Sequence, residues 1–230
     1  MDHIDAVPFL LFGVFIALVV ALIVWGNRYA RKRTQELAEV AQQIGFTFLG
    51  KMWRGPVLSL QHRISLLQRT RGRFNNVMTG SVAGLQATLF DYTYQQGKST
   101  VTQTLGAFSQ DLQLPAFELR AENVFDRIGE VFAHRDIDFD SHLDFSKRFF
   151  LRSPDEAATR ELFTPALLTY FEQIPEGEKW HVEGSGSTLI IYRWRGPVPA
   201  SEIRYFLEKT STIARTVLGA GGLKNRVASF

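Results

Sequence analysis

Residues 7–25 read VPFLLFGVFIALVVALIVW, and this stretch decides the architecture of the chain. It carries no charged side chain, and at about 1.5 Å of rise per residue a helix of this length spans roughly the hydrocarbon core of a bilayer. A cleaved signal peptide would need a basic segment before a shorter apolar stretch, whereas the chain begins with MDHID. The sequence therefore predicts one transmembrane helix at 7–26, after a short extracytoplasmic segment at 1–6.

Basic residues gather directly after this helix and predict its orientation. From Arg28 to Gly80 the chain has ten Lys and Arg side chains against two Glu, a net charge of +8, while the whole chain carries +3. Because Lys and Arg are retained on the cytoplasmic side, we expect the N-terminus outside and the C-terminal domain in the cytoplasm. A topology signal alone would explain this cluster, and contact with anionic lipid is the second interpretation. The residues expected at the membrane surface are Trp25, Arg28, Tyr29, Arg31, Lys32 and Arg33.

The basic juxtamembrane segment at 27–45 is predicted to form a helix of its own that leads out of the membrane. Apolar residues recur there at helical spacing, with Thr34 as the expected N-cap and Gly45 as the expected C-cap. The residues from 46 to 73 show no clear period. The sequence therefore makes no prediction of secondary structure for that stretch.

Residues 46–218 are expected to form a soluble α+β domain, in which antiparallel hairpins pack against helices. Runs rich in Val, Thr, Phe and Tyr are separated by Gly84 and by Gly97-Lys98, which predicts two hairpins. A further hairpin is predicted at Gly184-Ser185-Gly186, between two short strands. Helices are predicted at 121–132, 154–163, 164–174 and about 200–218, and a flexible tail at 219–230.

Several classes of catalytic site are excluded by composition and motif. The chain has no cysteine, which excludes disulfides, thiolate metal sites and a cysteine nucleophile. It also lacks HExxH, Walker and GxGxxG motifs, and Ser185 lacks the Gly-x-Ser-x-Gly spacing of a hydrolase nucleophile. We therefore expect no cofactor and assign no catalytic residue.

The densest polar cluster is HRDIDFDSHLD at 134–144. In an extended strand, residues two apart share one face, so four side chains could converge on a divalent cation. A calcium loop would need Gly and Glu where the chain has Ser141 and Lys147, and a solvated loop explains the cluster better. The candidate metal ligands are Asp136, Asp138, Asp140 and His142.

Two other polar groups have a functional and a plain interpretation. His181 and Glu183 alternate on a predicted strand, where they would act as a base and its orienting group or, as we prefer, form exposed polar surface. The basic run from Arg63 to Arg73 would suit phosphate, although a solvated loop is the commoner explanation. Because that run has no aromatic residues for base stacking and lies near a membrane, nucleic acid is disfavoured and lipid phosphate is the nearer ligand.

Five segments carry a resemblance to known proteins: LFDYTY at 89–94, FELRAENVFDRIGEVF at 117–132, DIDFDSHLDFSKRFFLR at 136–152, ELFTPALL at 161–168 and WHVEGSGSTLIIYR at 180–193. In their order the chain resembles an uncharacterised group of bacterial single-pass membrane-anchored proteins, over most of residues 28–218. The resemblance implies a bacterial source, and hence an inner (plasma) membrane, with the same single-anchor layout. The group has no assigned activity, so the resemblance gives no residue a role.

The leading hypothesis is a non-enzymatic, membrane-tethered cytoplasmic binding or scaffold module that contacts anionic lipid or a protein partner. The first alternative is a metal-dependent hydrolase that uses the cluster at 136–144. The second is a subunit of a membrane-envelope complex, held by packing of the transmembrane helix through Gly13 and Ala17, which have the small-xxx-small spacing.

Overall fold

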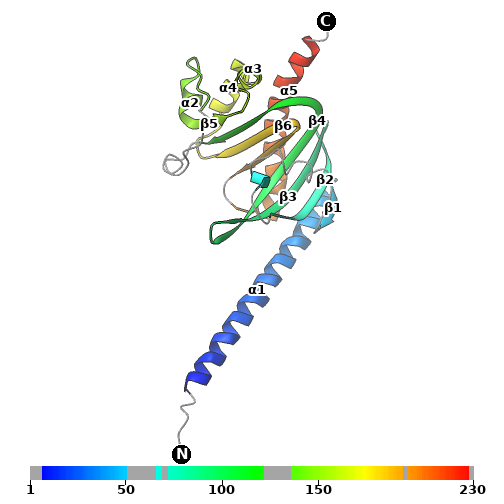
Figure 1. Cartoon of the computed structure of the whole chain (residues 1–230). Coiled ribbons are helices and arrows are strands. Elements are labelled where there is room, and N and C mark those ends of the chain that lie inside the picture. Colours follow the sequence, from blue (N-terminus) through cyan, green and yellow to red (C-terminus); the bar gives the residue numbers. More distant parts are fainter. Residues whose placement is uncertain (1–6, 51–65, 69–71, 122–135, 194–195, 228–230) are drawn as a thin grey trace, which may run out of the picture.

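The computed structural model describes residues 7–50, 66–68, 72–121, 136–193 and 196–227. One long helix, α1, runs from Val7 to Gln43, and its first half projects away from an α+β domain (Figure 1). The large apolar side chains of this half are exposed, from Leu10 to Trp25. Within the described residues, α1 is the one helix long and apolar enough to cross a membrane. An apolar surface of this size with no protein packed on it fits the predicted membrane anchor.

The boundary predicted inside α1 is wrong. Thr34 does not cap a second helix but lies within α1, where its Oγ1 is 2.9 Å from the carbonyl oxygen of Ala30. A threonine in a helix interior can satisfy its hydroxyl in this way without a break in the helix. The helix ends where the sequence predicts: Gly45 has a φ of +74°, the left-handed conformation of a glycine that follows a helix.

Six strands form one antiparallel sheet in the order β1-β2-β3-β4-β5, and β6 pairs with β4. The two hairpins predicted at Gly84 and Gly97 are present, and both glycines have positive φ. The α+β fold class is therefore confirmed. The strands are β1 (Thr47–Gly50), β2 (Arg73–Val82), β3 (Leu85–Gln96), β4 (Ser99–Ala121), β5 (Phe149–Arg152) and β6 (Trp180–Arg193).

Strands β4 and β6 are long and bend together. Their pairing shifts between Ser109 and Leu114 and again before Phe117, and Figure 1 shows β4 rise from its hairpin and turn over toward β5. At the bend, a Cβ on Gly184 would lie 2.3 Å from the ring of Phe117. The hairpin predicted at Gly184 to Gly186 is therefore wrong, because these residues stay inside β6 and the glycine admits an aromatic ring instead of forming a turn.

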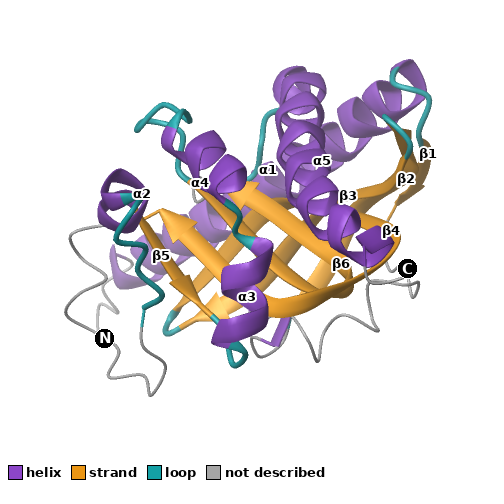
Figure 2. Ribbon diagram, turned by 90° about the horizontal axis from the view of Figure 1, so that it is seen from above, coloured by secondary structure: helices purple, strands orange, loops and turns teal. Residues whose placement is uncertain are grey.

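Helices cover one face of the sheet (Figure 2). They bury the larger core, in which Trp180 packs against Phe206 and four phenylalanines gather around Phe145. The helices at 154–163 and 164–174 are confirmed, and the Thr164 hydroxyl caps the second of them. The helices are α2 (Leu143–Arg148), α3 (Glu156–Leu162), α4 (Pro165–Glu172) and α5 (Ile203–Val227), with short 3-10 turns at Leu66–Gln68 and Ala200–Glu202.

Neither the flexible tail predicted at 219–230 nor the helix predicted at 121–132 is confirmed. Helix α5 continues to Val227, through most of the segment 219–230 where the sequence predicts a flexible tail. The helix predicted at 121–132 falls almost entirely on 122–135, outside the described residues.

The opposite face of the sheet carries a second, smaller core rich in aromatic side chains. Tyr92 stacks on Tyr94 with ring centroids 5.6 Å apart, and Phe74 packs against both Phe90 and Tyr92. Both faces of the sheet are thus buried over its central strands. A simple alternation of buried and exposed residues does not apply there.

Candidate functional site

One arginine fixes the C-terminal half of α1 to the sheet. Arg33 Nε and Nη2 donate to the two carboxylate oxygens of Asp91 on β3, both at 2.9 Å, and Nη1 donates to the carbonyl of Val198 at 2.8 Å. The side chains of Arg33 and Asp91 are 12% and 4% exposed. A bidentate guanidinium–carboxylate pair sets orientation as well as distance. The helix that carries the apolar anchor therefore has one defined position on the domain.

The buried Asp91 carboxylate is fully supported by neighbouring donors. Asn76 Nδ2 donates to it at 2.8 Å and Thr104 Oγ1 at 2.7 Å, while Thr34 Oγ1 lies 2.8 Å from Asn76 Oδ1. The backbone of Val198 donates in turn to Thr104 Oγ1 at 2.9 Å. Buried charges are tolerated when they are paired and hydrogen-bonded in this way. We call this network the joint; it consists of Arg33, Thr34, Asn76, Asp91, Thr104 and Val198.

A groove of about 480 Å³ lies beside the joint, between α1 and the segment 197–201. On α1 it contains Lys32, which pairs with Glu36 at 3.7 Å, and Glu39. The lining also includes Arg33, whose guanidinium is already bound to Asp91. Two cations against two carboxylates give the groove no excess of positive charge that would favour an anion. The remaining lining includes Tyr29, Val40, Gln43, Pro197, Pro199, Ala200 and Ser201.

The six residues expected at the membrane surface divide into two groups. Trp25 and Tyr29 are 71% and 65% exposed, and Arg28, Arg31 and Lys32 are exposed as well. Arg33 differs, because its guanidinium is held by Asp91 and Val198. These contacts give Arg33 a structural role, and lipid contact by the six residues stays a prediction.

The sequence contained a signal for the joint that pattern reasoning missed. Asp91 stands between Phe90 and Tyr92 and is the one charged residue of β3. A carboxylate at such a position must find a cation or several donors when the strand is buried. Its partner Arg33 is 58 residues earlier in the chain, so no local pattern connects the two.

The four candidate metal ligands make separate local contacts. Asp136 Oδ1 accepts a hydrogen bond from the Leu151 backbone at 2.9 Å, and His142 Nδ1 lies 3.2 Å from the Glu172 carboxylate. Asp138 and Asp140 are exposed. Within the described part of the chain, no three His, Asp or Glu side chains are grouped to hold a metal ion. Metal binding by this cluster stays a prediction without geometric support.

His181 and Glu183 are buried, at 6% and 2% exposure, so the exposed polar surface expected of them is wrong. The bend in β6 brings both against Tyr192 of the same strand. The rings of His181 and Tyr192 stack with centroids 4.9 Å apart, and the Tyr192 hydroxyl donates to Glu183 Oε1 at 3.3 Å. Burial, helped by the charge of Arg120, lowers the pKa of His181 from 6.5 to about 4. Burial and the nearby Glu183 carboxylate raise the pKa of Tyr192 well above 10.

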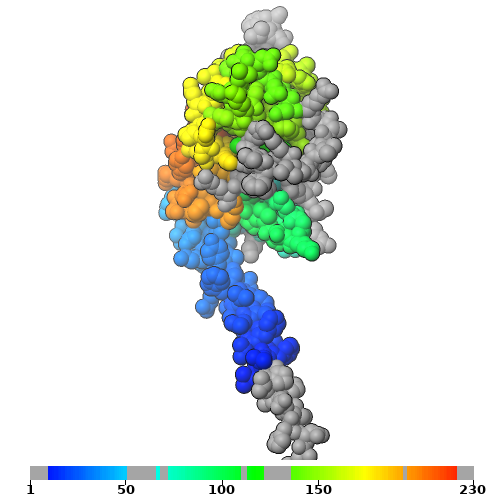
Figure 3. Space-filling view, turned by 90° about the vertical axis from the view of Figure 1, so that its left-hand side faces the viewer, coloured from blue at the N-terminus to red at the C-terminus, as the bar shows by residue number. Residues whose placement is uncertain are grey.

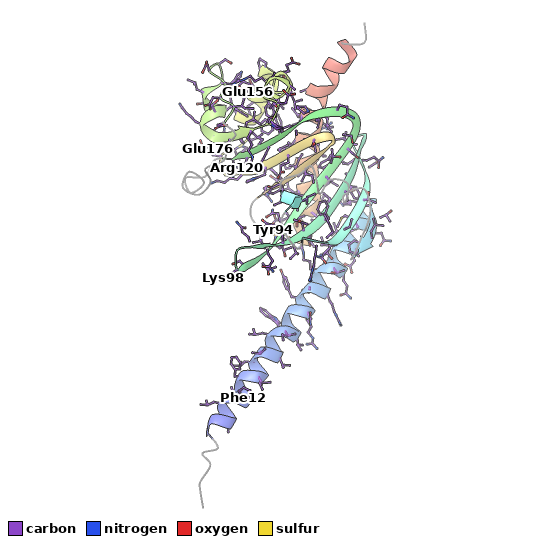
Figure 4. All side chains as sticks on the ribbon, viewed as in Figure 1. Phe12, Tyr94, Lys98, Arg120, Glu156 and Glu176 are labelled. Atoms are coloured by element: carbon purple, nitrogen blue, oxygen red, sulfur yellow. The ribbon has the colours of Figure 1, made fainter. Side chains whose placement is uncertain are left out.

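Charged residues continue this polar cluster across β4 and β5. Glu118 lies opposite Glu183 and Arg152 in the strand pairing and forms an ion pair with Arg152. Arg120, labelled in Figure 4, stacks over the Phe150 ring at 4.6 Å. A general base works best with a pKa near the working pH, so a histidine with a pKa near 4 is poorly suited to proton transfer at neutral pH. The cluster is better explained as a polar layer of the core than as a catalytic site.

No protein-family model and no curated protein matches the chain. Among solved structures, its fold is similar to the crystal structure of the mycobacterial trehalose monomycolate transport factor A, TtfA, with a TM-score of 0.58 and 13% sequence identity. The similarity covers 83% of this chain and 94% of TtfA. At this identity the comparison shows a shared fold, and the mycobacterial neighbour is consistent with the bacterial resemblance of the sequence.

Proposed function

We propose that this chain is a membrane-tethered, non-catalytic binding module that presents its α+β domain to a protein partner in a bacterial membrane process. The observation that carries the proposal is the joint, which fixes α1 to the sheet. Because α1 is one continuous helix, the joint also fixes the apolar span relative to the domain. A domain that needed only to stay near the membrane would be served by a flexible linker. A fixed pose is useful when the domain must meet a second component at a defined height and angle.

The orientation belongs to the proposal as well. Exposed Arg28, Arg31 and Lys32 follow the apolar span, and positive residues are retained on the cytoplasmic side. These residues support a cytoplasmic domain under an inner (plasma) membrane. A reporter that is active only in the cytoplasm should work when fused after Phe230, and activity of a reporter specific for the outside would overturn this orientation.

The kind of process is suggested by the fold neighbour and by the anchor. TtfA is by its name a transport factor, and this chain shares its fold over most of both lengths. A shallow surface on α1 contains Gly13, Ala17 and Ala21, small residues four apart on one helix face. Such faces allow another transmembrane helix to approach closely. We therefore favour an accessory subunit of a transport or envelope assembly as the setting in which this module works.

The hydrolase alternative ranks below this proposal. It requires Asp136, Asp138, Asp140 and His142 to converge on one cation, while two of these side chains make other contacts and two face solvent. No further observation on the described residues favours it.

The proposal is tested by purification of the full-length chain from solubilised, mildly cross-linked membranes. We expect a membrane-protein partner at fixed stoichiometry and a clear loss of that partner with Asp91→Asn, which weakens the joint but keeps the anchor. Glu156→Gln is the matched control, because Glu156 is an exposed carboxylate on α3 whose side chain forms an ion pair with Arg160, outside the joint. A chain that purifies without a partner, or equal recovery with a folded Asp91→Asn variant, would contradict the proposal.

A further inference from the structure

The β3–β4 hairpin points the same way as the membrane-spanning half of α1. In Figure 1 the hairpin descends from the sheet on the side where α1 leaves it, and Figure 4 labels Lys98 at its tip. The view turned by 90° agrees, since the green hairpin again extends downward beside the upper part of the blue helix (Figure 3). The domain thus has two projections toward the membrane side, one helical and one formed by strands.

The reach of these two projections can be compared from a common origin, because Arg33 of α1 and Asp91 of β3 are in direct contact. From Arg33 back to Trp25 the helix covers about 12 Å at roughly 1.5 Å per residue. From Asp91 forward to Gln96 the strand covers about 17 Å at roughly 3.4 Å per residue. Measured along α1, the hairpin tip therefore reaches the level of Trp25 when β3 is inclined to the helix by less than about 45°. Trp25 and Tyr29 mark the membrane surface that the sequence predicts.

The tip has the chemistry of a surface that contacts lipid headgroups. Residues 95–100 read QQGKST and are all exposed, and no acidic residue occurs between Tyr92 and Gln103. The tip offers amides, hydroxyls and one ammonium group, with no large apolar side chain that would enter the acyl region. Phosphate oxygens accept from such donors, and a lysine near an anionic leaflet is attracted to it.

The tip is also preformed. Gly97 takes a φ of +60° at the turn, and Gln95 Nε2 donates to Thr100 Oγ1 across the hairpin at 2.9 Å. Thr93 and Thr102 are joined by a hydroxyl hydrogen bond of 2.9 Å two residue pairs further from the turn. A contact surface that is already ordered loses little conformational entropy on binding.

We propose that the β3–β4 tip is a second membrane contact of this protein, with Lys98 at the lipid phosphates. This inference rests on the membrane tether of the proposed function and adds to it. Two separate contacts, α1 and the hairpin, fix the tilt of the domain as well as its height. The surface that faces a partner is then set by the bilayer and not by α1 alone.

The test uses the absence of native cysteine, which makes a single introduced thiol the only site for a label. The full-length chain is reconstituted in nanodiscs that contain a headgroup-attached quencher, and a fluorophore is placed at Ser99→Cys beside the tip. The matched control is Gln86→Cys, an exposed position at the opposite end of β3. Gln86 is as far from Asp91 along the strand as Gln96 at the tip is. Tyr29→Cys reports insertion of α1.

We expect quenching at Ser99→Cys several-fold above that at Gln86→Cys and comparable with that at Tyr29→Cys. The Lys98→Gln variant should lower quenching at position 99 in discs with anionic lipid, and should remove the difference between anionic and zwitterionic discs. Quenching at Tyr29→Cys with none at Ser99→Cys overturns the hairpin contact and leaves the tether intact. Absence of quenching at both positions overturns the membrane tether itself.

Discussion

Replacement of Arg33 by methionine removes the guanidinium that ties α1 to β3 and leaves the Asp91 carboxylate buried without its cation. Loss of one partner of a buried pair costs about 3–5 kcal/mol of unfolding free energy. Asn76 and Thr104 still donate to Asp91, which places Arg33→Met near the lower end, at about 3 kcal/mol. At about 2–4 °C per kcal/mol for a chain of this size, the melting temperature should fall by about 6–12 °C.

The double variant Arg33→Met/Asp91→Asn decides whether the two side chains act as a pair. With both charges removed, the loss should be smaller than the sum of the single losses, with a coupling energy of about 2 kcal/mol. Tryptophan fluorescence of the full-length chain in detergent, followed with temperature, supplies all four corners of this cycle.

Lys32→Met is the matched control for the cycle, since it removes the neighbouring cation. Its pair with Glu36 is exposed at 76% and 45%, so its loss should change stability by no more than about 0.5 kcal/mol. If Arg33→Met is as mild as Lys32→Met, or if the two single losses simply add, the joint does not hold α1 to the sheet.

Three further predictions concern the core and the metal hypothesis. The pKa of His181 is about 4 in the folded chain against 6.5 ordinarily. Between these values the unfolded chain binds a proton that the folded chain does not, so up to about 3 kcal/mol of unfolding free energy, fully present above pH 6.5, is lost as the pH falls toward 4. Melting curves of the wild type and His181→Gln should converge over that range, and parallel curves would refute this assignment. Gly184→Ala forces a Cβ to within 2.3 Å of the Phe117 ring and should lower the free energy of unfolding by about 1–3 kcal/mol, measured in thermal melts. In the control Gly177→Ala the added Cβ meets nothing within 4 Å, so its stability should be unchanged. Equal effects of the two variants would argue against the bend as described. Magnesium, calcium, manganese or zinc should leave the melting temperature unchanged. A true metal site would add about 2.7 kcal/mol to the free energy of unfolding at a hundredfold excess of the ion over Kd. A rise in melting temperature that Asp138→Asn abolishes would make the hydrolase the leading hypothesis.

The features that the sequence predicts correctly are those with local signals. The apolar span, the turns at Gly84 and Gly97, and the Thr164 cap each depend on a few neighbouring residues, and each is present. Propensity and turn chemistry act over the same short range, so a single sequence is sufficient for such elements.

The features that the sequence misses depend on long-range geometry. His181 and Glu183 alternate like exposed residues, but the bend in β4 and β6 folds the strand toward Tyr192 and buries both. Likewise, Arg33 belongs by position to the basic cluster and becomes structural only because Asp91 lies across from it. The apolar neighbours of Asp91 indicate that it needs a partner, but nothing near either site in the chain identifies the partner, so these contacts require the tertiary structure.

The central claim, that the domain is held in one pose on its membrane helix, is tested most directly by a pulsed electron–electron distance measurement. Spin labels at Arg28→Cys on α1 and Gln86→Cys on β3 report across the joint in the full-length chain in nanodiscs. The account predicts one narrow distance distribution, which broadens with Asp91→Asn at a temperature where that variant stays folded. A broad distribution in the otherwise unaltered chain would show that the domain moves freely on its anchor, and would contradict the account.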